Sequence, residues 1–540
     1  MTAVEARPAP AEVSDAWDYR RLLQWVQWVP LALVLIAQLA LSVRLIPSQV
    51  AGMDEARYIT AGHQLIYELW NGGGSPYYDN YFSGAPDIYS PLAAIADHLG
   101  GIVEVRLMSL AFMLTVTSQL FATTRRLFGH WAGVAAAALF ASVGLTHSVG
   151  VYSNYDALAM MFMASATYCA VRSRNSAKWL LLVPVALLAA NASKYTTVLF
   201  DPVIIGVAAL VCPSGWKDAG RRVVSLSVAT VCILLLGAYL AGGTYIHGII
   251  GSTFARRTGA LAVVIGAQYP TPARDILRES WTWMGPVLAT GALAVLACLT
   301  SRQGLRRAAL LALLVVAGLL VTIEALHLGS DHSMRQHDDF GIWFTCIAGG
   351  YVLGYLTGLL RSAPLRVVAS AGAAVLVLAS GYQSARTDRL TSAGSTAKGM
   401  EYFAQAGPFL AETRGRILAG GFTNFQMLYL NHLSVPWFRL FDDVYIKYPI
   451  PGRGGDSHGR ARGAVCFKVR PGCMYLEGPN AYRAAVRAHW FDFITLYGNH
   501  GANFPPDAAI TQAAEHTPGY ILLTDGPPTW IYAPSYRQAP

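Results

Sequence analysis

Apolar residues are unevenly distributed along this chain of 540 residues. Between about residues 30 and 385 they form repeated runs of about 15 to 20 residues, whereas residues 386–540 have the mixed composition of a soluble protein. A run of that length crosses the hydrocarbon core of a bilayer as an α-helix. The pattern therefore predicts a polytopic α-helical membrane protein with about eleven transmembrane helices and a C-terminal soluble domain.

The flanks of the apolar runs predict the orientation of the chain. Basic residues follow nearly every even-numbered run, for example Arg125 and Arg126 after the second. Such loops stay in the cytoplasm. Residues 1–23 are then a cytoplasmic, disordered N-terminus, and an odd number of spans places residues 386–540 outside the cytoplasm. The expected spans are 24–45, 104–124, 131–150, 157–171, 179–190, 197–212, 223–243, 281–300, 308–326, 340–360 and 367–383.

The C-terminal segment alternates strand-like and helix-like stretches. Residues 416–421, 490–496 and 519–523 have strand character, and residues 506–516 have helix character. This alternation predicts a small α/β domain. Cys466 and Cys473 bracket a short polar loop there, and they form a disulfide if the domain is extracytoplasmic or remain two reduced thiols.

Charge supports a membrane protein and excludes a nucleic-acid-binding one. Only 13% of the residues are charged, whereas soluble domains carry about 25%. The formal net charge of +9 arises mostly in short loops between apolar runs. The chain has no basic patch with interleaved aromatic residues, so we predict membrane lipids as partners and no nucleic acid.

An adjacent acidic pair, Asp54 and Glu55, follows the first apolar run. It opens a long outer loop, residues 46–103, in which residues 56–70 have the pattern of an amphipathic helix. Two carboxylates at a membrane surface can accept a proton, hold a divalent cation or bind sugar hydroxyls. The alternative is a helix cap, because acidic residues stabilise a helix N-terminus.

Further ionisable residues are predicted at the same outer face. Asp156 lies between the third and fourth runs and can face Asp54 across a cleft, or cap a helix. Lys194, Arg335 and the pair Arg256–Arg257 are cations where the positive-inside trend disfavours them. An anionic lipid phosphate explains them through charge-assisted hydrogen bonds. The alternative is snorkelling to lipid headgroups.

Aromatic and histidine side chains supply candidate substrate contacts. They are Tyr58, Tyr78, Tyr89 and His337. Tyrosine combines an aromatic face with a polar tip, which suits sugar binding and equally suits a membrane-interface belt. The spacing of His332 and His337 is not that of a zinc helix, so a hard cation such as Mg²⁺ or Mn²⁺ held by Asp54 and Asp156 is the better candidate cofactor.

Several of these motifs together resemble the GT-C glycosyltransferases. They are Met53-Asp54-Glu55-Ala56-Arg57-Tyr58 after the first helix, an acidic residue in the next outer loop, Ser193-Lys194-Tyr195-Thr196, and a soluble tail. The layout of residues 24–385 is similar to that of the branch containing protein O-mannosyltransferases and lipid A aminoarabinose transferases, glycosyltransferase family 39. One departure is Tyr89-Ser90-Pro91-Leu92, where that family often has His-Pro-Pro-Leu.

The resemblance implies an inverting transfer of a sugar from a polyprenyl-phosphate donor to a glycan, glycolipid or protein of the cell envelope. By that resemblance Asp54 is the catalytic base and Glu55 positions the acceptor or a cation. Asp156 is the second acidic residue, and Lys194 and Arg335 stabilise the leaving phosphate. It also implies a multi-pass protein of the plasma (inner) membrane that acts at its outer face.

Two other function classes remain open at this stage. A transporter or flippase of a lipid-linked substrate predicts ionisable residues in the middle of helices. Asp201 and Glu324 are the candidates for such positions. A scaffold that binds wall polymer gives no reason for Asp54, Asp156, Lys194 and Arg335 to share one face.

Overall fold

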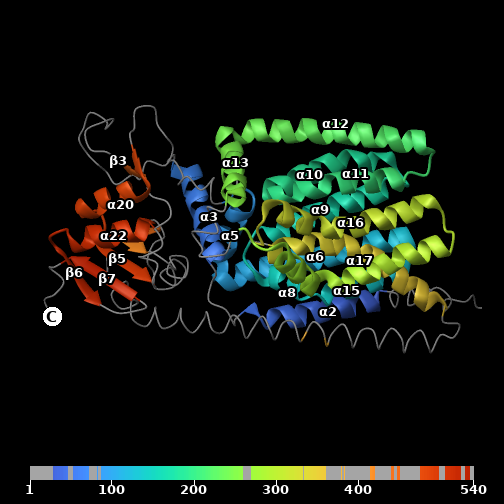
Figure 1. The fold of residues 1–540 in the computed structure, drawn as a ribbon, viewed down its shortest axis with the longest axis horizontal. Coiled ribbons are helices and arrows are strands. Elements are labelled where there is room, and N and C mark those ends of the chain that lie inside the picture. The colour runs from blue at the N-terminus through green and yellow to red at the C-terminus, as the bar shows by residue number, and fades with distance from the viewer. Residues whose placement is uncertain are drawn as a thin grey trace, which may run out of the picture.

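The structure is a computed structural model that combines a helical bundle with a smaller unit of strands and helices (Figure 1). It describes residues 28–46, 53–71, 82, 87–258, 269–331, 334–359, 379, 382, 414–419, 439–442, 447–449, 475–497, 505–524 and 529–534.

The bundle contains α-helices and two short 3₁₀ helices. They are α2 (Val29–Val43), α3 (Met53–Asn71), α5 (Tyr89–Gly100), α6 (Ile102–Phe128), α7 (His130–Ala141), α8 (Gly144–Val151), α9 (Asp156–Arg172), η2 (Ala177–Leu181), α10 (Leu182–Ser193), η3 (Tyr195–Phe200), α11 (Asp201–Leu210), α12 (Trp216–Ala241), α13 (Gly243–Arg257), α15 (Ala273–Thr300), α16 (Leu305–Leu328) and α17 (Met334–Leu359).

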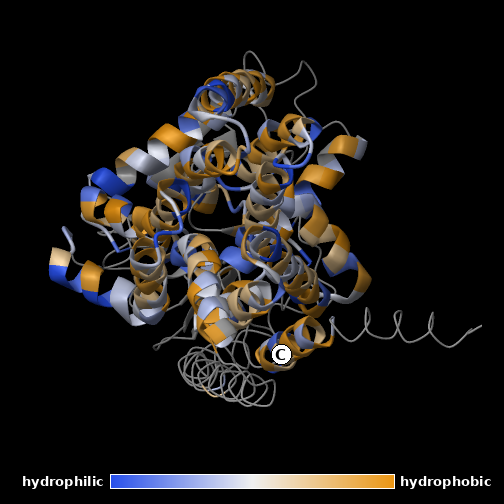
Figure 2. Cartoon of the chain, turned by 90° about the vertical axis from the view of Figure 1, so that its right-hand side faces the viewer, coloured by the Kyte–Doolittle hydropathy of each residue, from blue (hydrophilic) through white to orange (hydrophobic). Residues whose placement is uncertain are grey.

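Five of the described helices are long and apolar enough to cross a membrane, and α7 with α8 makes a sixth if that bent pair is one span. Large apolar side chains such as Leu235, Tyr239 and Leu240 of α12 are exposed, as lipid-facing residues are. Hydrophobic residues also prevail along the helices in Figure 2. The predicted polytopic helical membrane protein is confirmed, whereas the predicted number of eleven spans stays a prediction.

Several helix boundaries differ from the predicted ones. The expected span 131–150 is broken, because α7 and α8 meet at an angle of 70°. Val143 is extended there, with φ −78° and ψ 131°. The outer loop expected after residue 243 is largely helical, with Arg256 at the end of α13 and Arg274 at the start of α15. The predicted span 367–383 lies almost wholly outside the described residues.

The bundle core combines large aromatic side chains with close helix contacts. Trp343, Phe344 and Phe200 are fully buried, and the last two rings stack at 5.5 Å. A Cβ atom at Gly350 of α17 would lie 2.5 Å from the carbonyl oxygen of Ala132 in α7. Small residues of this kind let membrane helices approach closely, since lipid supplies little hydrophobic drive for helix association.

The C-terminal strands form a five-stranded sheet of order β2-β1-β5-β7-β6. Its strands β1 and β2, and β1 and β5, are parallel, whereas β7 is antiparallel to both β5 and β6. Strands β3 and β4 pair separately. The bounds are β1 (Ile417–Ala419), β2 (Leu440–Asp442), β3 (Lys447–Pro449), β4 (Tyr475–Glu477), β5 (Phe493–Tyr497), β6 (Tyr520–Thr524), β7 (Thr529–Pro534), α20 (Gly478–Arg487) and α22 (Pro505–Glu515).

This unit has its own apolar core. Leu418 and Ile494 of the sheet pack with Tyr482 of α20 and Ile510 of α22. The kinds of element agree with the predicted α/β character, and the extent of the domain stays a prediction because much of 386–474 lies outside the described residues. In Figure 1 the unit lies beyond α3 and α13, at one end of the bundle.

Candidate active site

The acidic pair lies inside the first turn of α3, because this helix begins at Met53 and not at residue 56 as predicted. Negative charge at this position is favoured by the partial positive charge of the helix N-terminus. Asp54 is partly exposed, whereas Glu55 is 0% exposed. Successive side chains on a helix point about 100° apart, so the two carboxylates face different surroundings.

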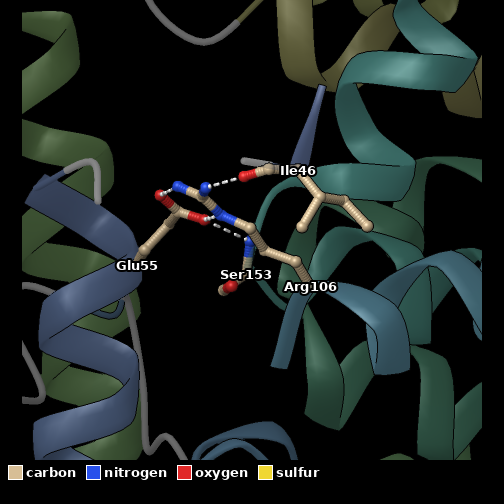
Figure 3. Close-up of polar contacts among 4 residues, drawn as sticks. All are labelled: Ile46, Glu55, Arg106 and Ser153. Carbon is tan, nitrogen blue, oxygen red and sulfur yellow. Dashed lines mark hydrogen bonds and ion pairs between the residues drawn. The ribbon is translucent and has the colours of Figure 1, made fainter. Parts of the chain in front are cut away.

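Glu55 forms a buried ion pair with Arg106 of α6 (Figure 3). Arg106 Nε donates to Glu55 Oε1 at 2.9 Å and Nη2 donates to Oε2 at 2.7 Å. The Ser153 backbone N–H also donates to Oε1, at 2.9 Å. Arg106 Nη1 donates to the carbonyl oxygen of Ile46 at 2.6 Å. We call this set of four residues the Glu55–Arg106 network.

The network joins four segments of the chain at the acidic pair. It links the residues after α2, the first turn of α3, the start of α6 and the segment that leads to Asp156. An Arg–carboxylate fork fixes orientation as well as distance. The geometry therefore favours a positioning role for Glu55 over the predicted direct contact with the acceptor or a cation.

Asp156 and Lys194 form a second buried ion pair. Asp156 is the first residue of α9, and Lys194 directly follows α10. They are 1% and 6% exposed. Burial is the largest influence on both pKa values: it raises the pKa of Asp156 and lowers that of Lys194. The opposite charge of the partner residue opposes each of these shifts.

The surroundings of Lys194 bring several predicted residues together. Its Nζ lies 4.9 Å from the ring centroid of Tyr155, a cation–π distance. Asp54 and Arg256 both act electrostatically on the Lys194 ammonium, and Asp54 also acts on Asp156. The structure thus brings Asp54, Asp156, Lys194 and Arg256 into one electrostatic neighbourhood.

Aromatic side chains border this charged group. Tyr58 packs against Phe82, Tyr89 and Tyr155, with ring centroids 5.1, 6.1 and 4.7 Å away. Burial raises the pKa of Tyr89 and of Tyr155, so both phenols are neutral at ordinary pH. The Tyr89 hydroxyl lies 3.2 Å from that of Ser109.

A small pocket of about 10 Å³ lies beside these rings. Phe82, Tyr89 and Tyr155 line it together with Ala192 and Ser193, the last residues of α10 before Lys194. The predicted substrate contact Tyr89 therefore lines the pocket, whereas Tyr58 packs against three of the aromatic rings around it. An aromatic pocket next to a buried ammonium suits a ligand that is both apolar and anionic.

The other predicted residues are placed less fully. Arg257 ends α13 and is exposed, and His337 lies in the first turn of α17 and is buried. Arg335 belongs to α17, and the placement of its side chain is not described. Outside the described residues lie Tyr78, Cys466 and Cys473.

Two further acidic residues, Asp338 and Asp339, were assigned by the sequence to a loop and lie in α17 instead. Both are 0% exposed. Thr146 of α8 donates to Asp339 Oδ1 at 3.1 Å, and three carboxylate oxygens of the pair have no hydrogen-bond partner. Asp156 acts electrostatically on Asp339, which places this pair close to the predicted site.

The fit of the predicted divalent cation is incomplete. In the described parts of the chain, no group of three or more His, Cys, Asp or Glu side chains is arranged to hold a metal ion. One carboxylate oxygen of Asp156 already accepts from Lys194, and its Oδ2 has no hydrogen-bond partner. A cation at Asp54 and Asp156 would need further oxygen ligands from a substrate or water.

Comparisons with known proteins bear on this arrangement. Residues 92–241 match the family model described as dolichyl-phosphate-mannose-protein mannosyltransferase. This segment includes Asp156 and Lys194. A search of curated proteins finds no match.

Solved structures resemble the chain over nearly its whole length. ArnT from Cupriavidus metallidurans bound to undecaprenyl phosphate matches with a TM-score of 0.56 and 16% identity, over 94% of this chain and 97% of that one. Its apo state matches with a TM-score of 0.53 and 16% identity, over 95% and 98%. An oligosaccharyltransferase AglB from Archaeoglobus fulgidus reaches 0.49 at 11% identity, over 96% and 75%, which does not establish a common fold.

The fold is that of a polytopic helical membrane protein, and it is similar to the fold of ArnT. Residues 92–241 match the mannosyltransferase model, and the chain as a whole has a fold similar to that of ArnT. Both findings support the predicted resemblance to the GT-C glycosyltransferases.

Proposed function

We propose that the protein is an inverting glycosyltransferase that moves a sugar from a polyprenyl-phosphate donor to an acceptor of the cell envelope. The acceptor is a glycan, a glycolipid or a protein. The observation that carries the proposal is the buried Lys194–Asp156 pair beside an aromatic pocket, with Asp54 close enough to act on both charges. ArnT is bound to undecaprenyl phosphate in its crystal structure, which supports the same class of donor here.

Asp54 is proposed as the general base. It is the carboxylate of the acidic pair that remains partly exposed, whereas Glu55 is held by Arg106. Asp54 would take the proton of an acceptor hydroxyl while the hydroxyl oxygen bonds to the anomeric carbon of the sugar. The bond from that carbon to the phosphate oxygen breaks, and the lipid phosphate leaves with the electron pair. General-base help contributes typically about 10²- to 10⁴-fold to a rate.

Lys194 and Arg256 are proposed to bind the donor phosphate, with Arg335 and Arg257 as further phosphate contacts. A phosphate gains negative charge as it leaves, and positive charge held in a site of low dielectric stabilises it. Lys194 is already desolvated, since it is 6% exposed. A bound phosphate would compete with Asp156 for the Lys194 ammonium and would leave the Asp156 carboxylate available for the acceptor or a cation.

The aromatic side chains at the pocket are proposed to contact the sugar or the first part of the lipid. Tyr58, Tyr89 and, from outside the described residues, Tyr78 offer aromatic faces, and His337 is a further candidate contact. A divalent Mg²⁺ or Mn²⁺ would be held by Asp54 and Asp156 together with substrate oxygens.

The site is proposed to face outward from the plasma (inner) membrane. Arg125 and Arg126 lie in the last turn of α6, and the Arg106 of the site lies in its second turn, so the site and the basic flank are at opposite ends of this helix. Basic flanks are cytoplasmic. Residues 1–23 are then cytoplasmic, residues 24–385 form the transmembrane domain with the loop 46–103, and residues 386–540 form an extracytoplasmic domain.

The alternative function is a transporter or flippase of a lipid-linked substrate, which predicts ionisable residues in the middle of helices. The positions of the ionisable residues do not favour it. Asp201 is the first residue of α11, Glu324 lies close to the end of α16, and Asp338 and Asp339 lie close to the start of α17. These ionisable residues therefore gather near helix ends, as surface chemistry requires. A glycosyltransferase is the function that this placement favours.

The test is sugar transfer in membranes with a panel of radiolabelled polyprenyl-phosphate sugars. Wild type is compared with Asp54→Asn at matched expression, and Asp275→Asn serves as the control, since Asp275 is an exposed acidic residue in the first turn of α15. The proposal predicts transfer by wild type and control and a loss of at least about 100-fold in Asp54→Asn. Absence of transfer by wild type from every donor, with lipid flipping present, would replace the proposal by the transporter.

A further inference from the structure

Three buried polar side chains surround the turn that carries Lys194, and the proposed reaction does not use them. They are Asn191 of α10, Thr197 of η3 and Asp201, the first residue of α11. Their exposed fractions are 6%, 1% and 6%. A buried polar group in an apolar bundle is costly unless it is hydrogen-bonded, and ionisable residues at such positions are commonly functional.

The three side chains are bonded in a row that ends at the Lys194 backbone. Asn191 Nδ2 donates to Asp201 Oδ2 at 2.9 Å. The Thr197 hydroxyl lies 2.6 Å from Asn191 Oδ1 and 2.8 Å from the Lys194 carbonyl oxygen. The Thr197 backbone N–H also donates to that carbonyl, at 3.1 Å. We call this row the Asn191–Thr197–Asp201 network.

The network holds a backbone conformation that ends a helix. Lys194 is extended, with φ −154° and ψ 115°, while its own N–H still closes the last turn of α10 on Ala190 at 2.8 Å. This change of direction aims the Lys194 side chain at Asp156 and the Tyr155 ring. Without fixed partners for its carbonyl, the extended residue would lose the contacts that favour one direction for its side chain.

A link to α13 extends the same arrangement. The Tyr245 hydroxyl donates to the carbonyl oxygen of Asn191 at 3.4 Å. Helix α13 ends in Arg256, which acts electrostatically on Lys194. The start of α13, the helix that ends in Arg256 and Arg257, is thereby bonded to the end of α10.

We propose that Asn191, Thr197 and Asp201 are positioning residues that hold the Lys194 ammonium at the donor-phosphate site. The identity of the ligand rests on the proposed function, whereas the positioning of Lys194 does not. Two measurements separate these claims, one on the lysine itself and one on the lipid phosphate.

The first measurement is the reactivity of the Lys194 amine in the full-length protein. Acetic anhydride labels amines, and mass spectrometry of the peptides gives the labelled fraction of Lys194. Thr197→Val removes the bonded hydroxyl at nearly constant shape. Thr196→Val is the matched control, because the neighbouring Thr196 is 1% exposed and its hydroxyl has no hydrogen-bond partner.

We expect Thr197→Val to raise the labelling of Lys194 several-fold, and Thr196→Val and Thr197→Ser to leave it as in wild type. Serine keeps the hydroxyl, so it tests the hydrogen bond and not the volume of the side chain. Equal labelling in Thr197→Val and wild type would overturn the positioning role, whether or not the protein binds a lipid phosphate.

The second measurement is the affinity of the purified protein for undecaprenyl phosphate. Loss of one hydrogen bond that positions Lys194 should weaken binding by about threefold to tenfold in Thr197→Val. The same substitution should have no effect in a Lys194→Met/Asp156→Asn background, which removes both charges of the buried pair together. An equal loss in that background would show that Thr197 does not act through Lys194.

The two measurements fail in different ways. If labelling responds as expected but wild type does not bind undecaprenyl phosphate, the positioning role stands and the proposed donor is wrong. If wild type binds the lipid and Thr197→Val neither changes labelling nor weakens binding, the proposed donor stands and the positioning role is wrong.

Discussion

Replacement of Arg106 by leucine removes the cation from the Glu55–Arg106 network. Arg106 is 2% exposed and Glu55 is 0% exposed, so the pair is shielded from water. The change deprives the Glu55 carboxylate of a bidentate partner and the Ile46 carbonyl of the Arg106 donor. Loss of one partner of a buried ion pair costs about 3 to 5 kcal/mol, because it leaves a buried charge uncompensated. We expect a loss of this size in the free energy of unfolding.

Replacement of both partners separates stability from positioning. Glu55→Leu/Arg106→Leu removes the two charges together, and apolar replacement of a whole buried pair is often neutral in stability. We therefore expect the double variant to regain most of the stability lost in Arg106→Leu. Sugar transfer should remain low in the double variant, because the hydrogen bond from the Ser153 backbone N–H to Glu55, next to Asp54 in the first turn of α3, is then lost.

The assay combines an unfolding titration with SDS in mixed micelles, followed by tryptophan fluorescence, and a transfer rate on the same preparations. A cost below about 1 kcal/mol in Arg106→Leu would show that the pair is not buried in the way described, since that is the range of exposed pairs. Full transfer by the double variant would show that the network stabilises the fold without positioning Asp54.

Two other predictions concern Lys194 and the contact between α3 and α5. Burial lowers the pKa of Lys194 from its ordinary 10.5, so its positive charge and the affinity for undecaprenyl phosphate should fall at a lower pH than for a solvated lysine. An arginine stays protonated, so Lys194→Arg should retain its affinity for undecaprenyl phosphate up to a higher pH in a binding titration. If the affinity falls at the same pH in Lys194→Arg and wild type, Lys194 is not the group that causes the fall. Gly62→Ala should destabilise the protein by about 1 to 3 kcal/mol or more, since a Cβ there would lie 1.8 Å from the Ser90 carbonyl oxygen. The control Gly220→Ala, an exposed helical glycine with nothing within 4 Å of its Cβ, should gain about 0.5 to 1 kcal/mol, and equal effects of the two in thermal unfolding would contradict the close contact.

Part of the site could be predicted because its residues break a trend along the sequence. Lys194 is a cation at an outer helix end, and Asp156 is the acidic residue in a short outer loop. Both depart from the pattern of the apolar runs, and the structure places them in one ion pair. Asp54 and Glu55 stood out in the same way, although their adjacency did not show that they face different partners.

Arg106 was missed because the sequence does not show which carboxylate it pairs with. It lies 51 residues from Glu55, inside a run expected to be a plain transmembrane helix. A signal was present, since Arg106 is an isolated cation near the outer end of that run, against the positive-inside trend. The choice of partner depends on how α3 and α6 pack, which is a tertiary property.

The break between α7 and α8 was missed for a similar reason. Residues 131–150 are continuously apolar enough for one span, and periodicity alone gives no bend. In the structure Thr146 donates to Asp339, and His147 Nδ1 lies 3.0 Å from the hydroxyl of Ser42 in α2. The bent helix thereby brings polar side chains to buried partners that a straight helix would leave elsewhere.

The central claim is that Asp54 acts in the chemical step of sugar transfer and not in donor binding. It is tested most directly by single-turnover transfer with purified protein in lipid nanodiscs, saturated with the donor that supports activity. We expect Asp54→Asn to bind this donor with the affinity of wild type and to transfer its sugar at least about 100-fold more slowly. Two results would contradict the assignment of Asp54 as the base. One is a transfer rate in Asp54→Asn equal to that of wild type, and the other is a loss of transfer rate that disappears when the donor concentration is raised.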